Sequence, residues 1–80
     1  MIYVGKMTEI NQTQGAIRIT VQGPSLTGFD DRIEFLPKSK INIKRDRITG
    51  EYYIYIPDWL LYRKNINWHR ITEIMPISPK

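Results

Sequence analysis

Apolar and polar residues alternate along several short stretches of the chain, and the clearest alternation runs from Ala16 to Gln22. There, Ile17, Ile19 and Val21 fall on one side of an extended chain, with polar residues between them. Alternation of this kind indicates a strand with one buried side and one solvent-facing side. We therefore expect an antiparallel β-strand at this position, with the three apolar residues in the core.

Other stretches show a similar two-residue period and are bounded by turn-forming residues. We expect strands at about 2–10, 32–36, 40–44 and 51–56, with a last strand near 67–74. Residues 45–50 form the loop of a predicted hairpin, in which Gly50 supplies a permissive backbone conformation. The residues that this pattern places on the inner sides of the strands are Ile33, Phe35, Ile41, Ile43, Tyr52, Ile54 and Ile56.

A short helix is predicted at Pro57–Lys64, because a proline without an N–H suits the first helical position. Asn65 fits the left-handed residue that often follows a helix. On so short a helix we expect only one of the adjacent Leu60 and Leu61 to be buried, leaving the other for a partner. The large ring of Trp59 is expected in the core.

The order of elements and the composition together indicate one small, mainly β domain over residues 1–80. Fourteen isoleucines against a single alanine favour pleated sheets over helices. A helical turn before the last strand is typical of a five-stranded antiparallel barrel of the SH3-like type. The alternative is an OB-like barrel, which would place its helix after the third strand.

The residue types present give little support for a catalytic function. The chain has no cysteine, and His69 is its one histidine, with no second base beside it. Asp30 and Asp31 precede Glu34, but such a cluster is more often a solvated loop than a magnesium site. We expect a non-enzymatic protein without cofactor or metal. Without a secretory signal or about 18 consecutive apolar residues, we also expect it to be cytoplasmic and to make no membrane contact.

Positive charge is concentrated in the second half of the chain. The net charge is +4, and five cations lie between Lys38 and Arg47 against one acid. Tyrosines follow directly, and strand alternation is expected to place Lys38, Lys40, Asn42 and Lys44 on one solvent-facing side of the hairpin together with Tyr53 and Tyr55, with Arg45 and Arg47 at its tip. Rings among cations can stack on bases while the cations hold phosphates. Two alternatives remain open, namely lysines that keep exposed strands from aggregating and tyrosines that pair across strands for stability. The predicted nucleic-acid-binding residues are Lys38, Lys40, Lys44, Arg45, Arg47, Tyr53 and Tyr55.

Two short motifs bracket this region: LPKSKI beginning at Leu36, and IPDWL beginning at Ile56, followed by Lys64. Together with GAIRI from Gly15, they resemble a small accessory module of bacteriophage and other mobile-element proteins over about residues 13–66. The resemblance implies a phage or prophage origin, often near DNA-metabolism genes. It brings no established activity and no site residues.

Two classes of function follow from these observations. The first is binding of nucleic acid, single-stranded and without strong sequence preference, through the basic hairpin. The second is occlusion of an acidic surface on a host protein, such as a defence nuclease in the manner of an anti-CRISPR protein, or service as a small subunit of a larger complex. Oligomeric state and the choice between DNA and RNA stay open. The candidate residues for a protein interface are Leu60, Leu61, Tyr62 and Arg63.

Overall fold

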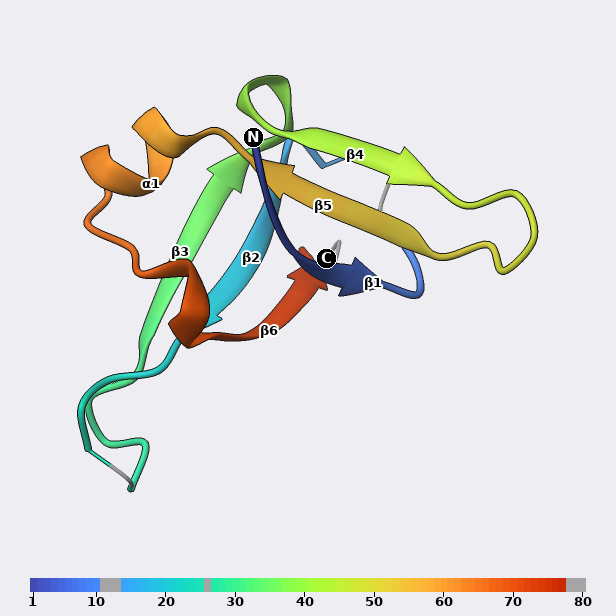
Figure 1. Cartoon of the computed structure of the whole chain (residues 1–80). Helices are drawn as coiled ribbons and strands as arrows, with labels where there is room; N and C mark the ends of the chain where they lie inside the picture. Colours follow the sequence, from blue (N-terminus) through green and yellow to red (C-terminus); the bar gives the residue numbers. More distant parts are fainter. Residues whose placement is uncertain (11–13, 26, 78–80) are drawn as a thin grey trace.

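The computed structural model describes residues 1–10, 14–25 and 27–77. Within these ranges the chain forms strands, one short α-helix and two 3₁₀ turns (Figure 1). The elements are β1 (Ile2–Met7), β2 (Ala16–Val21), β3 (Arg32–Pro37), η1 (Lys38–Lys40), β4 (Asn42–Arg45), β5 (Tyr52–Ile56), α1 (Asp58–Arg63), η2 (Trp68–Arg70) and β6 (Ile71–Pro76).

The strands form two three-stranded antiparallel sheets. One has the order β1-β5-β4 and the other β3-β2-β6. The sheets cross each other, and β1 passes close to β6 where they meet (Figure 1). The mainly β architecture with one short helix is therefore confirmed. The described residues contain six strands rather than five, and the two sheets do not pair into a closed barrel.

The core lies between the sheets and takes residues from both. Ile17 and Ile19 of β2 are fully buried, as are Ile54 and Ile56 of β5. Val21 is also buried, so the predicted inner side of β2 is confirmed. The remaining core residues come from β1, β3, the turn before β4, α1 and the segment after it, and they are Met7, Leu36, Ile41, Leu60, Leu61 and Ile66.

The predicted orientation of β3 is wrong. Ile33 and Phe35 are 47% and 53% exposed, whereas Leu36 is fully buried. The cause is the register with β2, which pairs Leu36 with Ile17 and Phe35 with Arg18. Directly paired residues face the same side of a sheet, so the polar residues of β3 share the side of Leu36.

Those polar residues meet the end of the helix. The Arg32 guanidinium donates from Nη2 to the carbonyl oxygens of Lys64 at 3.2 Å and Asn65 at 2.8 Å. The Glu34 carboxylate forms ion pairs with the Arg32 guanidinium at 3.5 Å and with the Lys64 ammonium at 3.8 Å. Carbonyls at the end of a helix lack partners within it, and Arg32 binds those of the two residues that directly follow α1. Asn65 has φ 55°, which confirms the predicted left-handed stop.

The predicted packing of the helix is wrong in two respects. Leu60 and Leu61 are both buried, at 3% and 5% exposure, while Trp59 is 50% exposed. Adjacent helical residues point about 100° apart, so a helix set against the core over a wide arc buries both leucines. The preceding residue then lies outside that arc, which brings the indole to the surface.

Three strand boundaries also differ from the prediction. β1 ends at Met7 instead of continuing to Ile10. The strand predicted from Lys40 begins at Asn42, because residues 38–40 form a 3₁₀ turn. The last strand begins at Ile71, after a second such turn. In each case, residues that alternate as they would in a strand form a turn or an irregular segment instead.

Candidate nucleic-acid interface

The hairpin between β4 and β5 is organised by one carboxylate. Asp46 Oδ1 accepts from the backbone N–H of Ile48 at 2.8 Å and of Thr49 at 3.3 Å. Aspartate commonly forms such bonds to amides two or three residues ahead, and they hold a turn. Gly50 has φ 75°, as the predicted hairpin required. Hydrogen bonds from the amides of Ile48 and Thr49 lower the pKa of Asp46 from its ordinary value.

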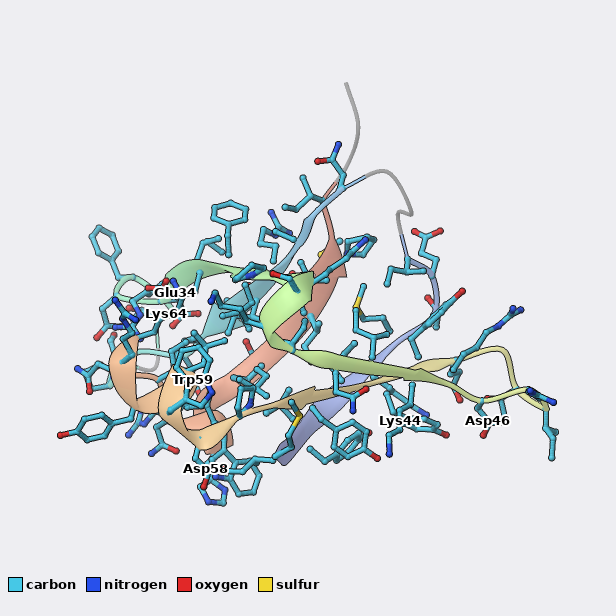
Figure 2. All side chains as sticks on the ribbon, turned by 90° about the horizontal axis from the view of Figure 1, so that it is seen from above. Glu34, Lys44, Asp46, Asp58, Trp59 and Lys64 are labelled. Carbon is cyan, nitrogen blue, oxygen red and sulfur yellow. The ribbon has the colours of Figure 1, made fainter. Side chains whose placement is uncertain are left out.

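The solvent-facing side of the β1-β5-β4 sheet gathers aromatic rings beside a cation. Lys44 pairs with Tyr53 and Asn42 pairs with Tyr55 across β4 and β5. On the other side of β5, Tyr3 of β1 pairs with Tyr55. We call this surface the tyrosine face and define it as Tyr3, Asn42, Lys44, Tyr53 and Tyr55. The predicted common side of Lys44, Tyr53 and Tyr55 is thus observed, with Lys44 between α1 and the hairpin tip at Asp46 (Figure 2).

The Tyr3 ring contacts each of the other two rings in a tilted arrangement. The Tyr3 centroid lies 5.5 Å from that of Tyr55 and 6.0 Å from that of Tyr53, at interplanar angles of 56° and 54°. The Lys44 ammonium lies 5.2 Å from the Tyr55 centroid, within cation–π range. Tyr3 is 45% exposed, while the other two rings are half-buried. Tyr3 therefore offers the most accessible ring for stacking.

The Tyr53 hydroxyl links this face to the hairpin. It donates to Asp46 Oδ2 at 3.4 Å. Burial raises the pKa of Tyr53, and the charges of Asp46 and Glu51 raise it further, so the phenol stays protonated at neutral pH. Beside it, the Lys6 ammonium pairs with Glu51 at 3.0 Å, and this hydrogen bond raises the pKa of Lys6. The charge of Lys6 is thereby matched locally, which leaves Lys44 as the cation of the face.

The other predicted cations lie elsewhere. Arg45 pairs with Tyr52, its guanidinium 5.9 Å from that ring, on the opposite side of the sheet from Lys44. Arg47 is exposed at the hairpin tip. Lys38 and Lys40 belong to η1, so strand alternation does not place them on the tyrosine face. The predicted common side of Lys38, Lys40 and Lys44 is therefore not formed.

The proposed protein-interface residues also separate. Tyr62 is 90% exposed and Arg63 is exposed, so both are accessible to a partner. Leu60 and Leu61 belong to the core, so neither is an accessible anchor. Sequence reasoning missed Tyr3, because its proximity to Tyr55 depends on the pairing of β1 with β5. The available signal was the strand-forming run Ile2-Tyr3-Val4.

Residues considered for catalysis or metal binding have structural contacts. The His69 ring stacks on that of Trp68, with centroids 3.7 Å apart. Asp30 and Asp31 accept hydrogen bonds from the backbone amides of Ser25 and Gly23 in their loop. Among the described residues, no group of three or more histidine, cysteine or acidic side chains is placed to hold a metal ion. None of the helices in the same ranges is long and apolar enough to cross a membrane.

This surface offers a ligand three flat rings, the Lys44 cation and, at the hairpin tip, the exposed Arg47. Rings of this kind stack on bases, and cations contact phosphates. No protein-family model matches the chain, and no curated protein or solved structure matches it either. Function is therefore inferred from the geometry.

Proposed function

We propose that the protein binds single-stranded nucleic acid through the tyrosine face and has no catalytic role. The observation that supports this is the cluster of Tyr3, Tyr53 and Tyr55 on one side of one sheet, where Tyr3 contacts both other rings and Lys44 lies over the Tyr55 ring. A base stacks on an aromatic ring whatever its identity, so weak sequence preference follows. Arg45 and Arg47 add positive charge towards the hairpin tip.

The proposal includes the wider setting that the sequence motifs imply. In this setting, the protein is a phage-type accessory protein that acts on nucleic acid in the cytoplasm. We also propose that the fold is an opened variant of the SH3-like small barrel, in which β1 and β6 approach each other without pairing. Small barrels commonly use one exposed sheet surface to bind an extended strand.

The first test is the dependence of binding on salt. Fluorescence anisotropy of a 3′-labelled 12-nucleotide dT strand without a 5′-phosphate is measured between 50 and 300 mM salt. Phosphate contacts from Lys44 and Arg47 predict a log–log slope of about −1.4, or roughly a 12-fold loss over this range. An affinity that does not change with salt would contradict the proposal.

Stacking is tested with single tyrosine variants in the same assay. Tyr3→Ala is expected to weaken binding by about 1–3 kcal/mol, because it removes the most exposed ring of the face. Tyr62→Ala is the matched control, since that ring is 90% exposed on α1 and belongs to a different surface. Equal losses in both variants would show that binding does not depend on the tyrosine face.

A second candidate function is occlusion of an acidic groove on a host protein. The specific observation is Ile48, which is 95% exposed at the hairpin tip beside Arg47. An apolar residue that protrudes among cations can fill a pocket while the cations meet acids around it. Capture of one host protein from nuclease-treated lysate, lost on Ile48→Asp and accompanied by no oligonucleotide binding, would favour this function over the first.

A further inference from the structure

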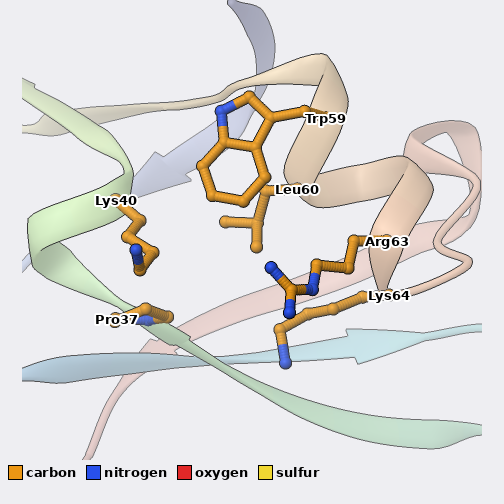
Figure 3. Close-up of a pocket in the computed structure, with 6 residues that line it drawn as sticks. All are labelled: Pro37, Lys40, Trp59, Leu60, Arg63 and Lys64. Carbon is orange, nitrogen blue, oxygen red and sulfur yellow. The ribbon is translucent and has the colours of Figure 1, made fainter.

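A second positively charged site lies at the other end of the β4–β5 hairpin, between α1 and η1. It is an open pocket of about 580 Å³, within the usual range for small-molecule sites. Lys40 and Pro37 approach from one side, Arg63 and Lys64 from the other, with Trp59 and Leu60 between them (Figure 3). We call it the basic pocket and define it as Pro37, Lys40, Trp59, Leu60, Arg63 and Lys64.

The three cations of the basic pocket are poorly neutralised. Neither Lys40 nor Arg63 forms an ion pair with an acidic side chain in the part of the chain that the structure describes. Lys64 shares Glu34 with Arg32, at the longer distance of 3.8 Å. Like charges around one hollow repel each other, and an anion bound among them relieves that repulsion. The pocket is therefore suited to a ligand with negative charge.

The remaining wall of the pocket is flat and apolar. Trp59 is 50% exposed, and its indole lines the hollow (Figure 3). The Lys40 ammonium lies 5.6 Å from the indole centroid, so an anion held by Lys40 lies close to this ring. Pro37 and Leu60 supply further apolar surface. A ligand that uses both features needs a planar group attached to its anionic group.

We propose that the basic pocket binds a nucleotide, with the phosphate between Lys40 and Arg63 and the base against the Trp59 indole. Guanidinium and ammonium groups form strong charge-assisted bonds to phosphate oxygens, and indoles stack on bases. Inorganic phosphate satisfies only the cations, and a nucleoside satisfies only the ring. The chemistry is shared by a free mononucleotide and by the 5′-phosphorylated end of a strand.

Tryptophan fluorescence reports on this site directly. Trp68→Phe leaves Trp59 as the one indole of the chain, because there are two tryptophans in all. In this background AMP, adenosine and inorganic phosphate are titrated at constant ionic strength. AMP is expected to quench Trp59 with an affinity about tenfold higher than that of adenosine. Quenching by adenosine as strong as that by AMP, or none by AMP up to about 10 mM, would overturn the proposal.

Charge variants locate the phosphate. Lys40→Gln and Arg63→Gln are each expected to weaken AMP binding about tenfold. Lys6→Gln removes the same charge from the opposite end of the hairpin, where Lys6 pairs with Glu51, and is expected to leave AMP binding unchanged. Thermal melts by circular dichroism confirm that each variant is folded. An equal loss in Lys6→Gln would mean that net charge alone governs binding and would refute the pocket.

The source of the nucleotide is settled by competition. A 5′-phosphorylated dT tetranucleotide that displaces AMP, when its unphosphorylated counterpart does not, identifies strand ends as the ligand. Displacement by neither, with AMP still bound, identifies free mononucleotides. The tyrosine face is tested with a strand that has no 5′-phosphate, so either site can fail without affecting the result for the other.

Discussion

Arg32 performs a task that its position in an alternating strand does not suggest. Its stem lies on the inner side of β3, and its guanidinium reaches the carbonyls of the two residues that directly follow α1 and the carboxylate of Glu34. A long side chain can bury its stem while its charged head stays near water. The helix has only six residues, so partners for its terminal carbonyls matter for whether it forms.

Replacing Arg32 should therefore destabilise the protein. Arg32→Met keeps an apolar stem but removes both hydrogen bonds to the helix end, and we expect a loss of about 1–2 kcal/mol. For a domain of this size the melting temperature should fall by about 4–8 °C per kcal/mol. Arg32→Lys, which keeps the charge and a donating nitrogen, should lose less. Identical melting curves for wild type and Arg32→Met would contradict this role.

At the level of elements, the β4–β5 hairpin depends on the ionised Asp46. Its carboxylate accepts from the Ile48 and Thr49 amides and from the Tyr53 hydroxyl, and these bonds lower its pKa from 3.8. A carboxylate with a lowered pKa stabilises the folded form above its unfolded pKa. That stabilisation is lost as the pH falls through the folded value.

The corresponding prediction concerns acid pH. The amide proton shifts of Ile48 and Thr49, followed by NMR from pH 6 to pH 2, should titrate with a midpoint below 3.8. In Asp46→Asn the amide oxygen still accepts but does not ionise, so these shifts should be flat. Asp46→Ala should remove the turn bonds at every pH. A midpoint above 3.8 in the wild type would be inconsistent with the hydrogen bonds described.

An element could be predicted from the sequence where the residues that specify it lie within the element itself. Ile17, Ile19 and Val21 alternate with polar residues, and the turn glycine Gly50 and the helix stop at Asn65 are local signals too. These features follow from the chain itself and were predicted correctly.

Orientation and proximity depend on pairing with distant strands. Ile33 and Phe35 look like the inner side of β3, yet pairing with β2 turns Leu36 inward instead. Likewise, β1 could be recognised as a strand, but no local pattern places Tyr3 beside Tyr55. A one-residue change of register moves every side chain to the other side, which is why hydrophobicity alone misassigned β3. The candidate site was therefore only partly predictable.

At the scale of the whole molecule, Gly5 lies where the two sheets meet. The register between β1 and β5 shifts between Tyr3 and Gly5, and Gly5 has φ 150°, a conformation that L side chains rarely adopt. A Cβ at this position would lie 2.8 Å from Ile74 Cδ1 of β6. The glycine thus permits both the irregularity in β1 and the close approach of β6.

Gly5→Ala is expected to destabilise the fold by about 1–3 kcal/mol, measured by urea denaturation. Gly15→Ala is the control, because nothing lies within 4 Å of its added Cβ and its φ is not positive. Since Ile74 Cδ1 can move but the backbone cannot, Ile74→Val should not rescue Gly5→Ala. Full rescue would show that the contact with Ile74, and not the backbone strain, causes the loss.

Because the two sheets do not close into a barrel, β4 is one of the edge strands: within the described residues its hydrogen-bonded neighbour is β5, on one side. Its outer N–H and C=O groups form a sheet edge, which can pair with the edge of another molecule. Lys44 and Arg45 make up half of β4, so two copies paired through it would place four cations on one short ladder. The protection is electrostatic and weakens as the Debye length shrinks. At high protein concentration and high ionic strength, this repulsion is screened, and we expect self-association through β4.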